Sequence, residues 1–192
     1  MTSGDWTWSD AYHSIDSSIY KVGSSSLLIT PTTETWGYRQ TADLMTSGYL
    51  ETWIYAVPNM TYSAWSAAGY NGNANGVAYS GPSTARGIFI HPKNGFVRIG
   101  IGKGGGNPTY LWSTDASTVV ASQWWKYKWT WWQSGADLVH RLQYKRNEED
   151  PWISAFVDKT EVLTFTRKYA AVSASTVGGE AYFDETTYYN LT

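Results

Sequence analysis

Among the residues of this chain that could do chemistry are its carboxylates. Hydrolysis of a glycosidic bond needs two carboxylates about 5–10 Å apart. The acidic residues that come nearest to such a pair lie close to the end of the chain: Glu180, Asp184 and Glu185. Asp184 and Glu185 are neighbours in a segment rich in strand-forming residues, so we expect their side chains to point to opposite faces. The spacing therefore argues against a glycoside hydrolase and assigns no catalytic residue.

A polysaccharide lyase would need different groups: a Tyr or His base, and an Arg or Gln that neutralises the carboxylate of a uronic acid. The chain contains side chains of these types at Arg39, Gln40, His91, Arg98, His140 and Tyr144. The sequences around them do not form the strand motifs that polysaccharide lyases with a β-sandwich fold use. A lyase is therefore a minor alternative, and we expect the protein not to be an enzyme.

Three glycines after an apolar segment imitate a dinucleotide-binding motif. Gly100, Gly102 and Gly105 have the G-x-G-x-x-G spacing, but Asn107 and Pro108 follow where the motif needs the start of a helix. We interpret the segment as a turn.

Composition excludes several further classes of function. The chain has 192 residues, a formal net charge of -2 and no cysteine, which excludes disulfides and thiol nucleophiles. Its 14 Lys and Arg residues are scattered, so nucleic acid is not expected as a partner. The apolar runs are too short for a spanning helix, and the first ten residues do not form a signal peptide. We expect no membrane insertion.

Sugar binding has looser requirements: an aromatic ring to cover a pyranose, and polar groups to bind its hydroxyls. Both kinds occur in and beside a Gly- and Asn-rich segment that spans residues 69–86. The candidate ligand-binding residues here are Trp65, Tyr70, Asn73, Asn75, Tyr79 and Arg86, joined by Tyr110 and Trp112. The alternative is that Asn and Gly are present because turns need them.

The most distinctive segment is QWWKYKWTWW, from Gln123 to Trp132, in which five of ten residues are Trp. Alternation along a strand places its members on two faces. One face carries Trp125, Tyr127, Trp129 and Trp131; the other carries Trp124, Lys126, Lys128, Thr130 and Trp132. We expect the first face to be core, and Trp124 and Trp132 to form a rival binding surface if the second face is exposed.

Other segments predict short strands separated by turns, about twelve to fourteen in all, with one domain over residues 1–192. The apolar runs 87–91 and 96–101 flank Pro92-Lys93-Asn94-Gly95 and predict a β-hairpin. A second hairpin is expected between Ile153–Val157 and Glu161–Phe165. Lys168–Ala174 is interpreted as a helical turn or a loop. The predicted fold is an all-β, two-sheet antiparallel sandwich.

Four segments resemble known sandwiches in the expected order: Val22–Thr30, Gln123–Thr130, Ala155–Val162 and Gly178–Tyr189. Together they resemble the concanavalin A-like and laminin G-like jelly rolls that include carbohydrate-binding modules. The resemblance implies two stacked sheets, sugar binding on a concave face or at loops, and a structural calcium with Asp184 as a ligand. An ordinary carboxylate is the alternative for Asp184, because Ca²⁺ needs six to eight oxygens.

The sequence therefore favours a non-catalytic module or adhesin that binds a polysaccharide or a cell-surface glycan. The alternative is a structural or attachment subunit of an extracellular assembly, such as a virion decoration or fibre protein, and the expected partners then include a homo-oligomer or a virion or surface assembly. Its support is the Met1 start without a signal peptide and the many Trp and Tyr residues that could form subunit contacts. The expected location is extracellular or on a virion surface.

Overall fold

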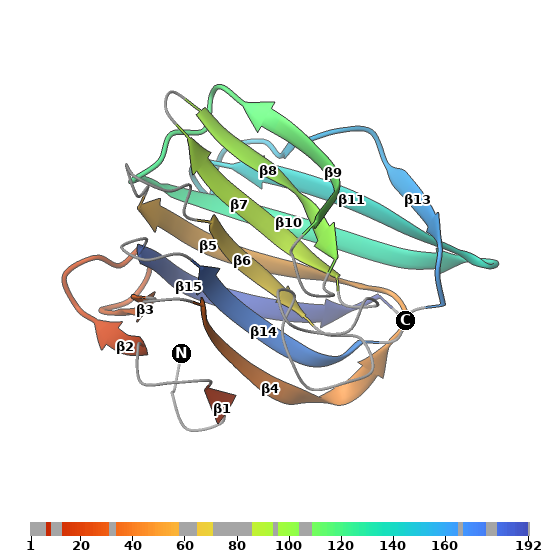
Figure 1. Ribbon diagram of the computed structural model, residues 1–192, viewed down its shortest axis with the longest axis horizontal. Helices are drawn as coiled ribbons and strands as arrows, with labels where there is room; N and C mark the ends of the chain where they lie inside the picture. Colours follow the sequence, from red (N-terminus) through yellow and green to blue (C-terminus); the bar gives the residue numbers. More distant parts are fainter. Residues whose placement is uncertain are drawn as a thin grey trace.

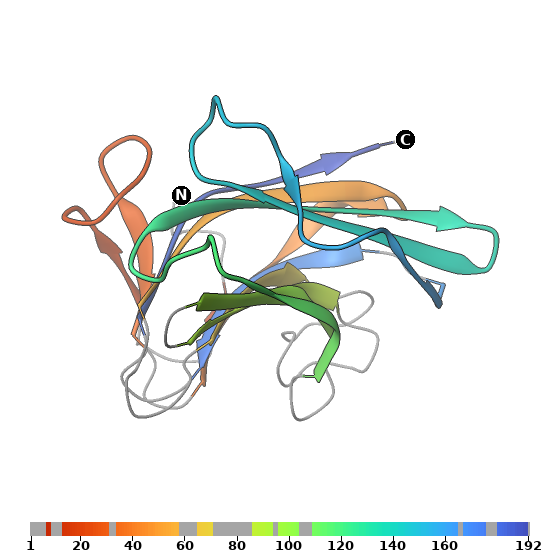
Figure 2. The same cartoon turned by 90° about the horizontal axis from the view of Figure 1, so that it is seen from above.

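The protein folds into two antiparallel β-sheets that pack face to face (Figures 1 and 2). The computed structural model describes residues 7–8, 13–30, 34–57, 65–70, 86–93, 96–103, 109–164, 167–175 and 180–191. These residues form strands, turns and bends without a helix, and none of their elements is a helix that could cross a membrane. The predicted all-β sandwich is confirmed.

One sheet has seven strands, seen in Figure 1 from β7 and β8 across to β4. In spatial order they are β1 (Thr7–Trp8), β4 (Glu34–Met45), β14 (Arg167–Ser175), β6 (Trp65–Tyr70), β7 (Arg86–Lys93), β8 (Phe96–Lys103) and β9 (Thr109–Ala116). β7 and β8 form the hairpin predicted from the sequence, with Lys93 opposite Phe96.

Strand β14 differs from the prediction of a helical turn or loop at Lys168–Ala174. It pairs with β4 on one side and with β6 on the other. A strand with neighbours on both edges satisfies its backbone hydrogen bonds in the ladder, and this tertiary context overrides the weak local preference of the segment.

The other sheet has eight strands. Seven of them follow the spatial order β12 (Ile153–Ser154), β11 (Asp137–Lys145), β10 (Trp124–Ser134), β5 (Gly48–Val57), β15 (Glu180–Asn190), β3 (Ser26–Ile29) and β2 (His13–Asp16). The eighth, β13 (Lys159–Val162), also pairs with β11. The expected hairpin between the segments of β12 and β13 is therefore wrong, because each pairs with a different part of β11 and the chain between them arches away.

The core lies between the sheets, and strand β10 supplies its largest side chains. Trp125 is 5% exposed, and Trp129 and Trp131 are fully buried, with ring centroids of the latter two 4.9 Å apart. Isoleucines of the facing sheet complete the packing: Ile88, Ile90, Ile99 and Ile101. Each large apolar side chain buried here stabilises the fold by about 1.5–3 kcal/mol. The prediction that the first face of the Trp-rich strand is core is confirmed.

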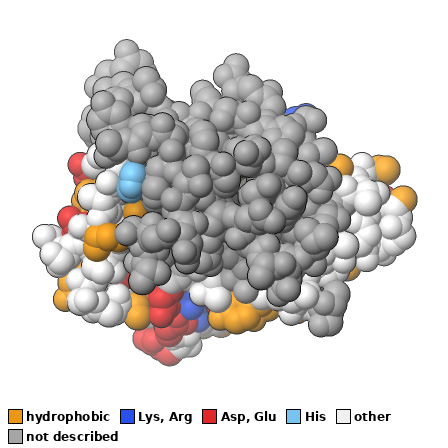
Figure 3. Space-filling view, turned by 90° about the horizontal axis from the view of Figure 1, so that it is seen from below, with side chains coloured by type: hydrophobic (Ala, Val, Ile, Leu, Met, Phe, Trp, Pro, Cys, Tyr) orange, Lys and Arg blue, Asp and Glu red, His pale blue; other side chains and the backbone are white. Residues whose placement is uncertain are grey.

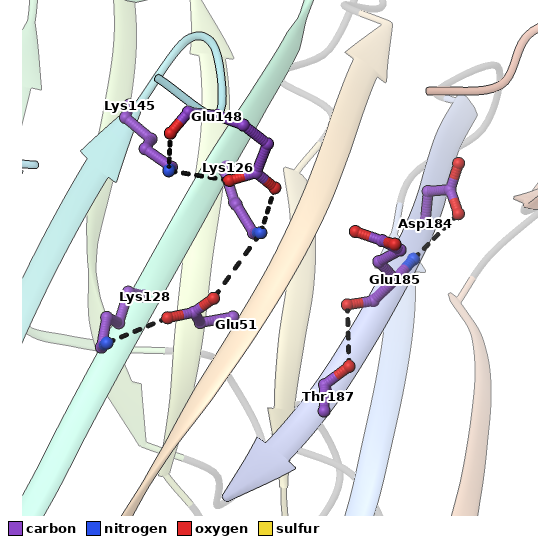
Figure 4. A network of polar contacts seen from close by, with 8 residues as sticks. All are labelled: Glu51, Lys126, Lys128, Lys145, Glu148, Asp184, Glu185 and Thr187. Atoms are coloured by element: carbon purple, nitrogen blue, oxygen red, sulfur yellow. Dashed lines mark hydrogen bonds and ion pairs between the residues drawn. The ribbon is translucent and has the colours of Figure 1, made fainter. Parts of the chain in front are cut away.

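A bulge in β15 changes where its acidic residues point. The register with β5 shifts between Asp184 and Thr187, and Glu185 has a φ of 45°. Thr186 turns inward, where its hydroxyl lies 2.8 Å from that of Thr52, while Asp184 and Glu185 both lie on the outer side of the strand (Figure 4). The expectation that these two carboxylates point to opposite faces is therefore wrong, because it assumed a regular strand.

Candidate functional site

The solvent-facing side of the eight-stranded sheet over β5, β10 and β11, which we call the outer face, carries a dense set of polar and aromatic side chains. Alternation along β10 brings Lys126, Lys128, Thr130 and Trp132 to this face. The antiparallel register then fixes their neighbours on the adjoining strands. Lys145, Gln143 and Arg141 of β11 lie opposite Lys126, Lys128 and Thr130, and Glu51 of β5 lies opposite Lys128.

A groove of about 580 Å³, which we call the edge groove, opens where β11 meets the end of the outer face. Its lining residues are Arg141, Gln143, Ser154, Phe156, Val157 and Asp158. Ser154 pairs with Gln143 across the sheet edge, and the chain that arches from β12 to β13 supplies the opposite wall. The groove thus depends on the same pairing that separates β12 from β13.

The polar side of the edge groove is held by a two-bond ion pair. Arg141 donates from Nε to Oδ1 of Asp158 at 2.9 Å and from Nη2 to Oδ2 at 2.6 Å. These hydrogen bonds, with the charge of Arg141, lower the pKa of Asp158 despite partial burial. The guanidinium also lies 5.5 Å from the ring of half-buried Trp132. An aromatic ring and a planar set of hydrogen-bonding groups therefore stand side by side at the groove.

Further along the outer face, three lysines and two glutamates form a network that we call the lysine cluster: Lys126, Lys128, Lys145, Glu51 and Glu148 (Figure 4). Glu148 bridges Lys126, which it contacts through Oε1, and Lys145, whose Nζ is 2.8 Å from Oε2. Glu51 lies 2.9 Å from Lys128 and 3.6 Å from Lys126. The two lysines that hold Glu148 are nearly buried, with side chains 10% and 8% exposed.

The charges of this cluster shift one another's pKa values. Burial alone would lower the pKa of Lys126, but the hydrogen bond and charge of Glu148, together with Glu51 and Glu185, raise it. Burial would raise the pKa of Glu148, yet its hydrogen bonds to Lys126 and Lys145 bring it below the ordinary value. Lys126 and Glu148 are therefore both charged at neutral pH.

Aromatic rings lie beside the lysine cluster. Lys145 is 4.9 Å and Lys128 5.7 Å from the ring centroid of Trp152, and Lys128 is 4.0 Å from that of Tyr49. Tyr49 in turn stacks on Tyr189 at 4.4 Å. In Figure 3, acidic and basic side chains adjoin a hydrophobic group at the lower border of the molecule. The outer face thus offers flat apolar surfaces next to fixed cations.

A second polar network lies on the core-facing side of β11, opposite the outer face. This network, which we call the inter-sheet cluster, consists of Arg86, His140 and Glu161. Glu161 accepts hydrogen bonds from Arg86 at 2.7 Å and 2.6 Å, and its Oε1 lies 2.9 Å from His140 Nε2. His140 Nδ1 accepts from the indole N–H of Trp129 at 3.2 Å. Because His140 Nδ1 accepts the hydrogen bond from Trp129, the neutral imidazole carries its proton on Nε2. His140 Nε2 therefore donates to Glu161.

Burial controls the protonation of the inter-sheet cluster. It lowers the pKa of His140, and the attraction of Glu161 only partly offsets this effect. Burial would raise the pKa of Glu161, but hydrogen bonds from Arg86 and His140 bring it down to about 2. A neutral histidine with no exposed side-chain surface is a structural group that joins the two sheets.

The residues considered for a lyase do not assemble into one site where the structure describes their side chains. His140 and Tyr144 both point into the core from β11, whereas Arg98 forms an exposed pair with Asp115 on the other sheet. Arg39 and Gln40 lie in β4, and His91 lies in β7.

The residues expected to bind a ligand are distributed over several places. Trp65 and Tyr70 lie in β6 and Tyr110 in β9, while Asn73, Asn75 and Tyr79 lie outside the described residues. Arg86 is buried in the inter-sheet cluster, where Trp112 contacts His140 with ring centroids 5.4 Å apart.

The two tryptophans of the rival surface stand at opposite ends of strand β10. Trp124 packs against Tyr55 at 5.6 Å, and Trp132 lies at the edge groove. They are eight positions apart along the strand, or about 26 Å. Trp132 alone of this pair adjoins the groove.

The carboxylate of Asp184 accepts hydrogen bonds from three backbone N–H groups. Its Oδ2 accepts hydrogen bonds from the backbone N–H groups of Lys21 at 3.0 Å and Val22 at 2.8 Å, and its Oδ1 accepts from Glu185 N–H at 2.9 Å. Among the described residues, no group of three or more His, Asp or Glu side chains is arranged to hold a metal. The surroundings of Asp184 therefore do not fit a calcium site and instead fix the loop before β3.

The sequence reasoning missed most of the outer-face residues. Arg141, Gln143 and Lys145 recur at every second position of β11, and this alternation with apolar residues is a signal that could have placed them on one solvent face. No such alternation could have placed Glu148 and Trp152 on the outer face, because both residues lie outside the long strands.

Solved structures of sugar-related proteins share this architecture. The carbohydrate-binding module CBM66 from Bacillus subtilis matches with a TM-score of 0.60 at 10% identity, over 97% of this chain and 96% of that one. The exoplasmic/lumenal domain of VIP36, in a Ca2+/Man3GlcNAc-bound form, gives 0.61 at 10%, over 98% and 86%. A glycoside hydrolase family 16 endo-glucanase from Bacteroides ovatus gives 0.58 at 12%, over 95% and 94%.

At these identities the likeness establishes the fold, and the predicted concanavalin A-like jelly-roll β-sandwich is confirmed. No family model matches the chain, and no curated protein matches it in sequence.

Proposed function

We propose that this protein is a non-catalytic carbohydrate-binding module that holds a polysaccharide or a cell-surface glycan on the outer face of its eight-stranded sheet. The observation that carries the proposal is the edge groove, whose lining residue Arg141 lies against the ring of Trp132 and beside Gln143 and Asp158 of the same lining. An aromatic ring covers the apolar face of a sugar, and planar polar groups bind pairs of its hydroxyls.

The known structures support the proposal at the level of architecture. Among the similar proteins, one is a carbohydrate-binding module, another has a Ca2+/Man3GlcNAc-bound form, and a third is an endo-glucanase. A sandwich of this kind therefore suits glycan ligands, although a fold by itself does not determine a function. We propose binding without catalysis because the carboxylates of the lysine cluster and of the edge groove form ion pairs with Lys or Arg.

The proposal is tested by measuring the affinity of the purified protein for neutral and acidic polysaccharides in native gels and by calorimetry. We expect Trp132→Ala and Arg141→Ala each to weaken binding by about tenfold, the loss typical of one stacking or bidentate contact. Arg98→Ala is the matched control, because Arg98 makes a similar exposed pair with Asp115 on the other sheet. Unchanged affinity in both Trp132→Ala and Arg141→Ala would contradict the placement of the binding site at the edge groove.

The loop residues remain a second proposed part of the binding surface. Trp65→Ala and Tyr79→Ala test them in the same assay, and Trp124→Ala tests the far end of β10. A loss confined to Trp65→Ala and Tyr79→Ala would move the site from the edge groove to the 65–79 segment, and a loss confined to Trp124→Ala would move it to the far end of β10.

Calcium is not expected to take part at the edge groove. The carboxylate of Asp158 faces Arg141, and Asp184 is occupied by backbone N–H groups. We expect a chelator to leave binding unchanged. A loss of affinity that added Ca²⁺ restores would show a calcium site elsewhere in the protein.

We also propose an extracellular location, where such ligands occur. Assembly into a larger structure is the second candidate, and it is favoured by apolar side chains exposed near one sheet edge: Ile153 at 46%, Val157 at 77% and Val162 at 83%. Native mass spectrometry separates the two, since a defined oligomer without affinity for any glycan would favour assembly over the module.

A further inference from the structure

The carboxylate of Glu148 occupies an unusual position in the lysine cluster. Its side chain is 54% exposed, whereas the side chains of Lys126 and Lys145 that it bridges are only 10% and 8% exposed. A solvent-accessible anion thus sits on top of two ammonium groups that the sheet holds in place. An anion from another molecule could make the same contacts.

The two lysines are fixed independently of the Glu148 carboxylate. They face each other across β10 and β11, the ring of Trp53 lies 5.5 Å from Lys126, and Lys145 also donates to the backbone oxygen of Glu148 at 2.6 Å. Glu148 itself belongs to the 147–150 turn, which the backbone N–H of Asn147 closes by donating to Asp150 Oδ2 at 2.9 Å. The side chain of Glu148 can therefore swing away while the lysines and the turn stay in place.

We infer that the lysine cluster is a subsite for the anionic group of an acidic polysaccharide, either a uronate carboxylate or a sulfate, and that Glu148 occupies this subsite when no ligand is bound. The inference rests on the proposed function and names the class of ligand. Once Glu148 moves away, three ammonium groups face the carboxylate of Glu51 and the more distant one of Glu185. The subsite then carries a net positive charge.

The neighbouring surface favours a sugar as the carrier of that anion. The ring of Trp152 lies 5.7 Å from Lys128 and 4.9 Å from Lys145, so a sugar ring could stack where its acidic substituent meets an ammonium group. Gln143 of the edge groove lies opposite Lys128, which makes the groove and the cluster one continuous surface. A nucleic acid would instead need a broad basic surface, and the net charge of the chain is -2.

The test compares Glu148→Gln with Glu149→Gln, the exposed neighbour, so that both variants change the net charge equally. The probes are polygalacturonate for carboxylate, dextran sulfate for sulfate, and unmodified dextran and galactan as neutral polymers. We expect Glu148→Gln to bind at least one acidic probe about three- to tenfold more tightly, as expected when an exposed competing ion pair is removed. Glu149→Gln should change the affinity less than twofold.

Loss of a lysine should act in the opposite direction. We expect Lys145→Gln to weaken binding of the acidic probe by about tenfold. Because this lysine is nearly buried, Lys128→Gln, with a side chain 23% exposed, provides a second variant, and thermal melting verifies that both fold.

The outcomes separate this inference from the proposed function. Tighter binding in Glu148→Gln alone supports the subsite, and the two acidic probes show whether carboxylate or sulfate is preferred. Equal effects of Glu148→Gln and Glu149→Gln, or binding of neutral polymers alone, would overturn the subsite and leave the module. Binding of polyglutamate or DNA as tightly as the acidic polysaccharide would also overturn it. Absence of binding to every polysaccharide would overturn the proposed function itself.

Discussion

Glu161 and Glu148 make the same kind of bridge in two different surroundings. Each carboxylate binds two side chains that donate hydrogen bonds, Arg86 and His140 in one case and Lys126 and Lys145 in the other. Glu161 is 16% exposed and lies where the two sheets meet, whereas Glu148 is 54% exposed and lies on a turn. Burial decides the role: water or a ligand can replace Glu148, but nothing can replace Glu161 without leaving charge in the interior.

The largest effect we expect is from Glu161→Ala. The variant takes away the carboxylate that binds the nearly buried Arg86 and the fully buried His140, and we expect a loss of about 3 kcal/mol in the free energy of unfolding, measured with urea. Asp115→Ala, which breaks the exposed pair with Arg98, should cost less than about 1 kcal/mol. Equal losses in the two variants would contradict the difference between buried and exposed bridges.

Acid should weaken the inter-sheet cluster. The folded-state pKa of Glu161 is about 2, against an ordinary value of 4.5, so its contribution is complete above about pH 5 and is lost as the pH falls toward 2. His140, whose pKa is also lowered, costs stability in the same direction, because below pH 6.5 the unfolded chain binds its proton more readily. Allowing for partial exposure, we expect Glu161 to contribute about 2 kcal/mol of this loss.

Urea unfolding at pH 7, 5 and 3 measures this dependence. In Glu161→Gln the contribution of the carboxylate is absent at every pH, so the decline in stability should be shallower than in the wild-type protein. Identical slopes for the two proteins would assign the acid sensitivity to other groups.

Asp184 provides an intermediate case, a buried carboxylate whose partners are backbone N–H groups. We expect Asp184→Asn to lower the free energy of unfolding by about 1–2 kcal/mol. The charge-assisted hydrogen bonds from the loop become neutral, and the NH2 group of Asn, itself a donor, faces backbone N–H donors. Hydrogen exchange should become faster at the amides of Lys21 and Val22. Asp16→Asn is the control, since Asn also accepts from the backbone in the turn where Asp16 binds Ser18 and Ile19. Unchanged exchange at Lys21 would contradict this role.

Local patterns were enough to predict much of the fold. The alternation in Gln123–Trp132 identified the core face of β10, and the Pro-Lys-Asn-Gly turn identified the β7–β8 hairpin, because both signals depend only on residues near in sequence. Pairing between distant segments was not predictable in this way. The bulge at Glu185 and the pairing of both β12 and β13 with β11 depend on neighbours that the local sequence does not specify.

The candidate site shows the same limit more strongly. Trp132 was among the expected ligand-binding residues, because alternation places it on the solvent face. Its partner Arg141 and the wall formed by Asp158 require the register of β11 against β10 and the arch after β12. The lysine cluster likewise needs Lys145 opposite Lys126, a relation between residues nineteen apart that no local period encodes.

The smallest effect on stability should come from Glu148→Gln. Its side chain is more than half exposed, and Gln keeps the shape and one oxygen that accepts hydrogen bonds, so we expect a change within about 0.5 kcal/mol. Lys126 and Lys145 would regain water at the surface that Glu148 now covers. A loss as large as that of Glu161→Ala would mean that the two buried ammonium groups need this carboxylate to fold, and Glu148 would then be a fixed part of the sheet that no ligand could displace.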